Sequence, residues 1–147
     1  MPVKSIPDNI PRVSPYLIVK DVGKTIEFLQ KVFNAEIAEK MFLPDGTINH
    51  GSVRIGDSLI MMGKASENHP PQSIMLYIYV EDTDSTYKRA LENGATSVME
   101  PSNQFYGDRN AGVKDSDGIS WWIATHIEDV SEEEMQKRNE ERAKSQK

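Results

Sequence analysis

The chain has 147 residues, a formal net charge of −6 and no cysteine. This length suits one domain that buries roughly two-thirds of its extended-chain surface. The acidic balance argues against a general nucleic-acid binder, and the absence of cysteine excludes disulfides, thiolate metal sites and cysteine nucleophiles. No run of about 18 apolar residues is present, so we expect no membrane contact and a cytoplasmic location.

The chain opens with a proline-bearing stretch, residues 1–12, which we expect to form an N-terminal arm. The β-branched and aromatic residues from Val13 to Lys20 predict a strand. Asp21 then occupies the position of a helix N-cap. Apolar residues recur at positions 22, 26, 29 and 33, in steps of four, three and four. This spacing predicts an amphipathic helix over the same residues.

Two tight turns divide the rest of the first half. The turn Pro44–Gly46 is expected to join a strand near Lys40 to one from about Ile48 to Ile55. A second turn at Gly56 leads into a strand over residues 58–62. The polar, proline-bearing stretch 63–73 is expected to be a linker.

The second half repeats this order. An apolar strand is predicted over residues 74–80, followed by a helix that Asp82 caps and that Asn93 and Gly94 terminate. A looser segment is expected over residues 100–110. The last strand, residues 119–125, follows a turn at Asp115–Gly118.

The two halves match at a constant offset in the sequence. Tyr16 and Asp21 of the first half correspond to Tyr77 and Asp82 of the second, so that 77 − 16 and 82 − 21 both equal 61. An internal repeat of this length is the signature of a duplicated supersecondary unit. We therefore predict an α+β fold in which a domain at 13–127 holds two tandem βαβββ modules, at about 13–63 and 74–127, related by pseudo-two-fold symmetry.

The tail at 128–147 differs in composition. Ser131 and Glu134 match a capping box, and Glu134 and Arg138 form an i,i+4 pair, so a charged C-terminal helix is predicted. It is either a solvated helix or an arm that packs on a second subunit.

The segments Phe105–Arg109, Gly112–Asp115 and Trp121–His126 resemble the vicinal oxygen chelate superfamily. The resemblance is to its glyoxalase/bleomycin-resistance type, and within that to a subgroup described as PhnB-like. It implies that the mixed sheets of two modules enclose a cavity and that subunits pair as homodimers.

The metalloenzymes of this superfamily carry one metal ligand on the first strand and one on the last strand of each module. By resemblance these positions fall on Ser14, Met61, Met75 and Trp122. Hydroxyl, thioether and indole groups are poor ligands for the usual divalent metals. We therefore expect no cofactor, although a divalent metal stays possible, and whether the protein is an enzyme stays open.

The same strand faces are rich in aromatic and thioether groups. Strand alternation places Ser14 with Tyr16, and Met75 with Tyr77, on one side. An apolar lining with a few polar tips is typical of a small-molecule pocket, whereas the alternative is a filled core. The candidate ligand-binding residues are Ser14, Tyr16, Met61, Met75, Tyr77, Arg109, Trp122 and His126.

Three polar residues are further candidates, and each has a structural alternative. Arg109 either holds an anionic ligand or forms an ion pair that fixes its loop. His126 either reaches the cavity mouth or makes a hydrogen bond that fastens the start of the tail. His50 is expected to make a surface or edge hydrogen bond.

Three functions follow from these observations. The first is a metal-independent homodimer that binds an apolar or aromatic small molecule. The second is a metal-dependent lyase or dioxygenase with displaced ligands, drawn from His50 or His126 and Glu100. The third is an interaction module whose charged tail recruits a protein partner.

Overall fold

The computed structural model describes residues 3–145, and the outermost two residues of the predicted arm and of the predicted tail helix lie outside this range. The chain divides into two compact modules at the junction of Ser73 and Ile74. The elements of the first module are β1 (Tyr16–Val19), α1 (Val22–Phe33), β2 (Glu36–Phe42), β3 (Ile48–Ile55) and β4 (Ser58–Lys64). Those of the second are β5 (Met75–Tyr79), α2 (Thr83–Glu92), β6 (Thr96–Asn103), β7 (Asp108–Lys114), β8 (Ser120–His126) and α3 (Glu132–Ser145).

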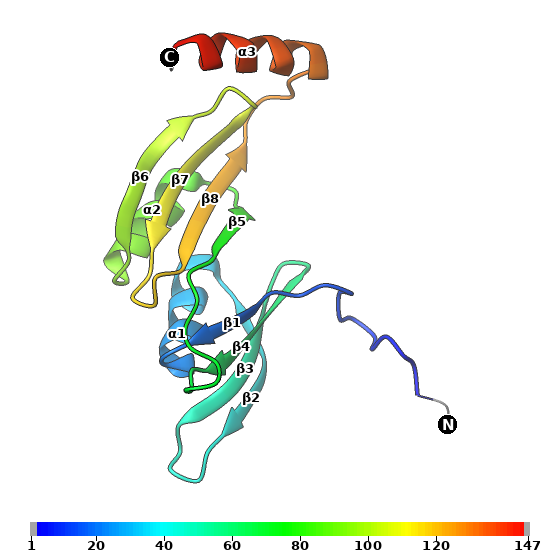
Figure 1. The fold of residues 1–147 in the computed structure, drawn as a ribbon, viewed down its shortest axis with the longest axis vertical. Coiled ribbons are helices and arrows are strands. Elements are labelled where there is room, and N and C mark those ends of the chain that lie inside the picture. Colours follow the sequence, from blue (N-terminus) through cyan, green and yellow to red (C-terminus); the bar gives the residue numbers. More distant parts are fainter. Residues whose placement is uncertain (1–2, 146–147) are drawn as a thin grey trace. The chain divides into compact units, whose positions relative to one another are not determined.

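Each module contains one four-stranded mixed sheet (Figure 1). The strand order is β1-β4-β3-β2 in the first module and β5-β8-β7-β6 in the second. The first strand of each sheet pairs in parallel with the last, and the remaining pairs are antiparallel. The predicted α+β class and the two βαβββ modules are thus confirmed.

A helix covers one face of each sheet, as the apolar spacing predicts. The Asp21 side chain accepts a hydrogen bond from the Lys24 N–H and caps α1, and Asp82 caps α2 in the same way. The apolar stripe of α1, including Leu29, is buried, and α1 packs on β3 and β4.

The core of the second module lies between α2 and its sheet. Trp121 is fully buried there, and its indole N–H donates to Asp115 Oδ2 at 2.9 Å. Because the buried indole keeps a hydrogen-bond partner, this large side chain can fill the core without an unpaired polar group. Ile123 and Val113 share this buried face.

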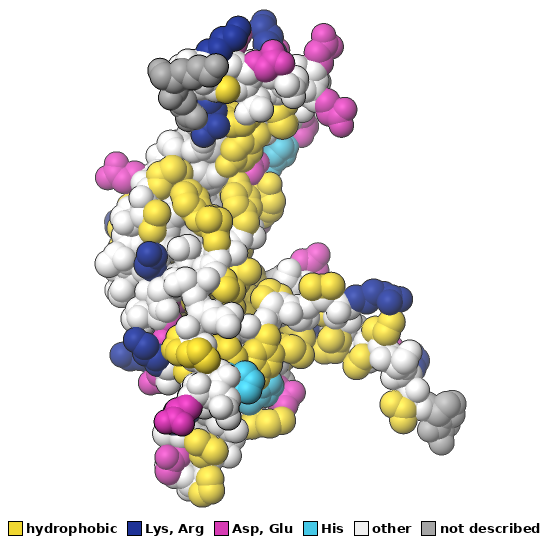
Figure 2. Space-filling view, in the orientation of Figure 1, with side chains coloured by type: hydrophobic (Ala, Val, Ile, Leu, Met, Phe, Trp, Pro, Cys, Tyr) yellow, Lys and Arg dark blue, Asp and Glu magenta, His cyan; other side chains and the backbone are white. Residues whose placement is uncertain are grey.

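Among residues 3–145, no helix of the same module covers the opposite face of either sheet. We call these surfaces the open faces. On the open face of the first module, Tyr16 is 51% exposed, and on that of the second module Tyr77 and Tyr79 are 42% and 61% exposed. Figure 2 shows hydrophobic side chains gathered over β7 and β8 on the visible face of the second module.

The first and last strands of each sheet in chain order, β1 and β4 or β5 and β8, keep the offset of the sequence repeat. Tyr16 lies opposite Met61 across β1 and β4, and Tyr77 lies opposite Trp122 across β5 and β8. The differences 77 − 16 and 122 − 61 are both 61. The repeat in the sequence therefore aligns the first and last strands of the two sheets.

The inner strands have a shorter offset. Met61 pairs with Ser52 on β3, whereas Trp122 pairs with Gly112 on β7, so that 112 − 52 = 60. A shift of one position moves a side chain to the other face of a sheet. Residues of β3 and β7 that match at an offset of 61 in the sequence consequently lie on opposite faces.

Two segments differ from the sequence-based expectations. Residues 100–110 are not loose: β6 continues to Asn103 and β7 begins at Asp108, with a short turn between them. Pro101 argued against a strand at this position in the sequence. However, β6 is an edge strand whose register shifts between Met99 and Ser102, and proline is tolerated at such a place. The predicted linker begins later than expected, because β4 extends to Lys64.

The predicted tail helix is confirmed as α3. Ser131 Oγ accepts a hydrogen bond from the Glu134 N–H at 3.1 Å, as the capping box requires. No described residue of α3 is buried. The helix is attached through Arg138, which donates to the Phe105 carbonyl at 3.0 Å and to Glu128 at 2.8 Å. Arg142 also lies over the Phe105 ring, 5.2 Å from its centroid.

Candidate functional site

The Trp122 indole lies flat against the backbone of the neighbouring strand on the open face of the second module. A Cβ at Gly112, its cross-strand partner, would lie 3.0 Å from two atoms of the indole ring. Glycine is therefore the residue that allows the ring to approach β7 so closely. The indole is partly exposed, so it forms an aromatic platform on the sheet.

Beside this platform, a single carboxylate anchors two phenols. Asp108 begins β7, and its side chain is only 4% exposed. Tyr77 and Tyr79 donate their hydroxyl protons to Asp108 Oδ2 at 2.7 and 2.8 Å. Successive residues on one face of β5 are thus fixed by the same oxygen, and their rings meet edge to face with centroids 5.5 Å apart.

The other oxygen of Asp108 pairs with His126, at the end of β8. The distance from His126 Nδ1 to Asp108 Oδ1 is 3.0 Å. The second ring nitrogen, Nε2, lies 2.7 Å from Asp129 Oδ1. His126 thus connects the buried carboxylate of Asp108 to Asp129 at the start of the tail. The contact with Asp129 is the tail-fastening hydrogen bond that the sequence offered as one of two interpretations.

Asn110 completes the polar group beneath the phenols. It is 2% exposed, and its Nδ2 donates to the hydroxyls of Tyr77 at 3.1 Å and Tyr106 at 2.6 Å. Its Oδ1 is buried and has no hydrogen-bond partner among residues 3–145. An unpaired buried acceptor of this kind is uncommon in folded proteins.

These contacts shift several pKa values. Burial alone would raise the pKa of Asp108, but hydrogen bonds from Tyr77, His126 and Tyr79 outweigh it and hold that pKa below its usual value. Burial and the bond to Asp108 raise the pKa of Tyr77. The bond to Asp108 raises the pKa of Tyr79, and Asp129 and then Asp108 raise that of His126. The carboxylate is therefore ionised and both phenols are neutral at ordinary pH.

The first module carries a simpler version of this arrangement. The Tyr16 hydroxyl lies 3.1 Å from His50 Nδ1, and the two rings are 5.8 Å apart. This confirms the hydrogen bond expected for His50. At the offset of the inner strands His50 corresponds to Asn110, so each module links its first-strand tyrosine to the same position on the inner strand. A Cβ at Gly63 would meet the Tyr16 ring, so this ring also lies on a glycine.

The structure brings four of the predicted site residues together on one face. Met75, Tyr77, Trp122 and His126 lie on the open face of the second module. Tyr16 and Met61 lie on that of the first module. Ser14 precedes β1, and its hydroxyl is buried without a partner within the described part of the chain.

Arg109 lies on the other side of its sheet. Its Nε and Nη2 donate to the two carboxylate oxygens of Asp84 on α2, at 2.8 and 3.0 Å. Its Nη1 donates to Asn103 Oδ1 at 3.0 Å. Of the two interpretations open from the sequence, the ion pair is the one formed, and Arg109 is separated from Tyr77 and Trp122 by the sheet.

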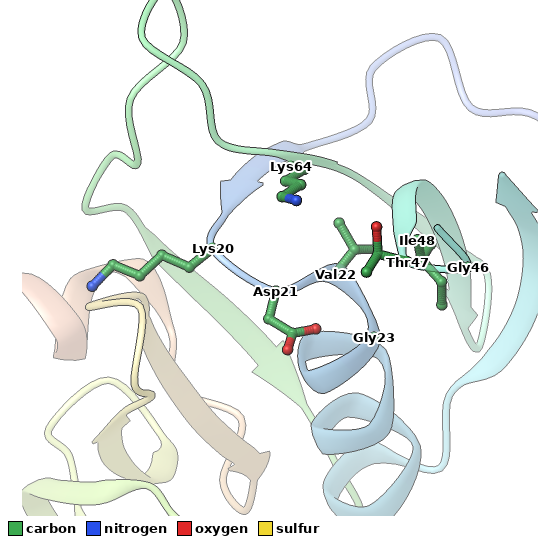
Figure 3. Close-up of a pocket in the computed structure, with 8 residues that line it drawn as sticks. All are labelled: Lys20, Asp21, Val22, Gly23, Gly46, Thr47, Ile48 and Lys64. Carbon is green, nitrogen blue, oxygen red and sulfur yellow. The ribbon is translucent and has the colours of Figure 1, made fainter. Parts of the chain in front are cut away.

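A separate hollow of about 300 Å³ lies beside the start of α1 (Figure 3). It is lined by Lys20, Asp21, Val22, Gly23, Gly46, Thr47, Ile48 and Lys64. Asp21 already caps the helix there, and Lys20 extends away from the side formed by Gly46 and Thr47. This hollow contains none of the predicted site residues.

The metal positions implied by the resemblance carry no typical ligand. Within residues 3–145, no three or more His, Cys, Asp or Glu side chains are placed to hold a metal ion. Glu100 lies on β6 rather than beside His126 in the network described above. Among the same residues, no helix is both long and apolar enough to span a membrane.

The comparison with known proteins agrees with this architecture. Residues 9–123 match the family model of the Glyoxalase/Bleomycin resistance protein/Dioxygenase superfamily. The chain therefore belongs to this superfamily. The uncharacterized protein Mb0911c of Mycobacterium bovis is 30% identical over 137 residues, which cover 86% of this chain and 90% of that protein. The uncharacterized protein Rv0887c of Mycobacterium tuberculosis is also 30% identical over 137 residues, covering 86% of this chain and 81% of that protein.

Solved structures show the same fold at lower identity. TioX from Micromonospora sp. ML1 has a TM-score of 0.67 and 21% identity, covering 80% of this chain and 99% of TioX. A glyoxalase/bleomycin resistance protein/dioxygenase family enzyme from Burkholderia phytofirmans PsJN has a TM-score of 0.64 and 18% identity, covering 76% of this chain and 95% of that one. These likenesses establish the fold and leave the ligand open.

Sequence reasoning missed the centre of the site. Asp108 was considered only together with Arg109, and Tyr79 and Asn110 were not considered as site residues. Strand alternation gives the signal for Tyr79, because it lies two positions after Tyr77. Asp108 and Asn110 lie in residues 100–110, for which the sequence predicts a loose segment, so strand alternation could not be applied to them.

Proposed function

We propose that the protein binds a planar aromatic small molecule on the open face of the second module, without a metal. The observation that carries this proposal is the Trp122 indole lying against Gly112 beside two phenols whose hydroxyls are fixed by Asp108. Fixed aromatic groups lose little conformational entropy when a ligand stacks on them. The four superfamily metal positions, which carry no typical ligand, support a binding role that does not depend on a metal.

The test is ligand binding by a variant that lacks the platform. Trp122→Ala is expected to weaken the binding of planar aromatic compounds by at least about fivefold, since one aromatic contact contributes about 1 kcal/mol beyond its buried area. Binding is measured by calorimetry with acridine, and folding by circular dichroism. Leu91→Ala on α2, which is 38% exposed and remote from the open face, is the matched control. Unchanged affinity in a folded Trp122→Ala protein would contradict the proposal.

We further propose that the protein acts as a homodimer. Each module leaves an open face with exposed aromatic and thioether groups, such as Tyr16 at 51% and Met75 at 63%. Contiguous apolar surfaces of this kind are commonly covered by a second chain. The placement in a PhnB-like subgroup also stays a proposal, based on the segment Phe105–Arg109 and the residues that follow it.

A further inference from the structure

The hydrogen bonds on the open face of the second module determine which polar groups a ligand meets. A phenol has one proton to donate, and Tyr77 and Tyr79 both donate theirs to Asp108. Their oxygens can therefore only accept further hydrogen bonds. Tyr77 already accepts one from Asn110, whereas Tyr79 is 61% exposed. The two phenols thus present acceptors and ring faces to a ligand.

Asn110 adds an unmet acceptor to the same network. Its amide protons point to the hydroxyls of Tyr77 and Tyr106, which fixes the amide orientation. The remaining amide oxygen is buried without a partner in the described chain, and the residue as a whole is only 2% exposed. The partial negative charge of this oxygen is consequently not compensated within the network.

The charged groups of this hydrogen-bond network carry a net negative charge. Asp108 and Asp129 flank a single imidazole, so His126 can offset at most one of their two negative charges. Arg109, the nearest guanidinium in sequence, lies across the sheet and is paired with Asp84. The exposed ring faces of Tyr77 and Tyr79 add the negative potential of their π systems.

We propose that the ligand of the second module is a cation, of the class of planar aromatic compounds that carry a protonated amine or a related N–H donor. Its ring stacks on Trp122, and its positive group lies against Tyr77 and Tyr79 with Asp108 behind them. Cation–π attraction and N–H donation to the phenol oxygens both favour such a group. This inference rests on the proposed binding function and defines its ligand class. The proposed charge of the ligand is opposite to that of the anionic ligand for which Arg109 was a candidate in the sequence.

A charge series on one ring system tests the proposal. The probes are 9-aminoacridine, which is a cation at about pH 8, neutral acridine, and the anion acridine-9-carboxylate. Their dissociation constants for the full-length protein are measured by calorimetry. We expect 9-aminoacridine to bind about fivefold more tightly than acridine, which corresponds to about 1 kcal/mol. The carboxylate is expected to bind most weakly.

Two variants that each remove one negative charge test whether Asp108 causes the preference for the cationic probe. Asp108→Asn keeps the shape of the side chain and is expected to bring the ratio between the cation and acridine close to one. Asp84→Asn removes the same formal charge on the α2 side and is expected to leave the ratio unchanged. Circular dichroism confirms that both variants are folded. If Asp108→Asn unfolds, Asp129→Asn at the exposed end of the same network is expected to lower the ratio in its place.

The outcomes separate this inference from the proposed function. Equal affinities for the three probes, all weakened by Trp122→Ala, would overturn the cation preference and leave the aromatic site in place. A ratio that persists in a folded Asp108→Asn or Asp129→Asn protein, or tightest binding of the carboxylate, would also overturn the preference. Binding that is unaffected by Trp122→Ala, or no binding of any probe, would overturn both.

Discussion

Asp108 shows how one buried carboxylate can organise an aromatic surface. Its burial opposes ionisation, yet three donors from β5 and β8 surround it. Hydrogen bonds to an ionised group are stronger than those between neutral partners, so the carboxylate stays charged. Its network then contributes stability at pH values above the usual aspartate pKa, and this contribution is lost as the pH falls through the lowered pKa of the folded state.

His126 gives the opposite pH dependence, which can be measured. Its pKa is raised above 6.5 by Asp129 and then Asp108, so the two ion pairs stabilise the fold fully below that value and are lost as the pH rises through the raised pKa. His126→Gln is therefore expected to lower the melting temperature most at about pH 5.5 and least at about pH 9. Calorimetric scans across this range check the expectation.

The control for this measurement is His69→Gln. His69 is exposed in the segment between the modules, and its backbone N–H and carbonyl pair with those of Ser66. Its effect on the melting temperature should show no comparable trend with pH. A His126→Gln effect that is the same at both ends of the range would show that the ion pairs contribute nothing.

At the scale of elements, α3 differs from α1 and α2 in what holds it. Helix α1 buries a mainly apolar stripe and α2 buries Thr83, Thr86 and Ala90, whereas α3 buries none of its described residues. Its attachment is polar and depends on Arg138, which contacts Glu128, Glu134 and the Phe105 carbonyl. Exposed ion pairs of this kind contribute little each, so the attachment should open readily.

Removing Arg138 should therefore release α3 without destabilising the module. In Arg138→Ala, amide hydrogen exchange is expected to speed up in residues 132–145, while global unfolding changes by less than about 1 kcal/mol. Lys137→Ala, one position earlier on the exposed side of the helix, is the matched control. Equal exchange rates in the two variants would mean that Arg138 does not hold the helix.

At the scale of the whole molecule, the open faces determine the expected assembly. Light scattering coupled to gel filtration should give twice the chain mass of 16.6 kDa. Met75→Lys places a charge on the open face of the second module, where burial of that charge in an interface is unfavourable, and should shift the protein toward the monomer. Leu91→Lys on α2 should not. A wild-type protein of single-chain mass would contradict the homodimer.

The sequence predicted the first and last strands of each module well, because the residue pattern that indicates them is local. Tyr16 and Tyr77 open the two halves, and strand alternation correctly placed Met75 on the same side as Tyr77. The caps Asp21 and Asp82 fixed where each helix begins. These features depend on neighbouring residues only, which is why they could be found without the structure.

The inner strands were less predictable because their pairing depends on distant residues. Asp108 and Asn110 contact Tyr77 only because β8 lies between β5 and β7 and aligns them. In addition, Pro101 argued against the strand that precedes these residues. Arg109 shows the same limit, because its partner Asp84 lies 25 positions earlier on a helix. Which face a residue occupies on β7 follows from the register and cannot be read from the repeat.

The change in offset from 61 to 60 and back records how the two halves diverged. The N-caps Asp21 and Asp82 are 61 apart, whereas the left-handed residues that follow the helices, Asn34 and Gly94, are 60 apart. The connection from Gly112 on β7 to Trp122 on β8 is one position longer than the connection from Ser52 on β3 to Met61 on β4, which restores the first offset. For a duplicated ancestor, these are two compensating changes in length. Together they leave β7 in the same place in its sheet as β3, so that the residue 60 positions after His50, rather than 61, meets the tyrosine of the first strand.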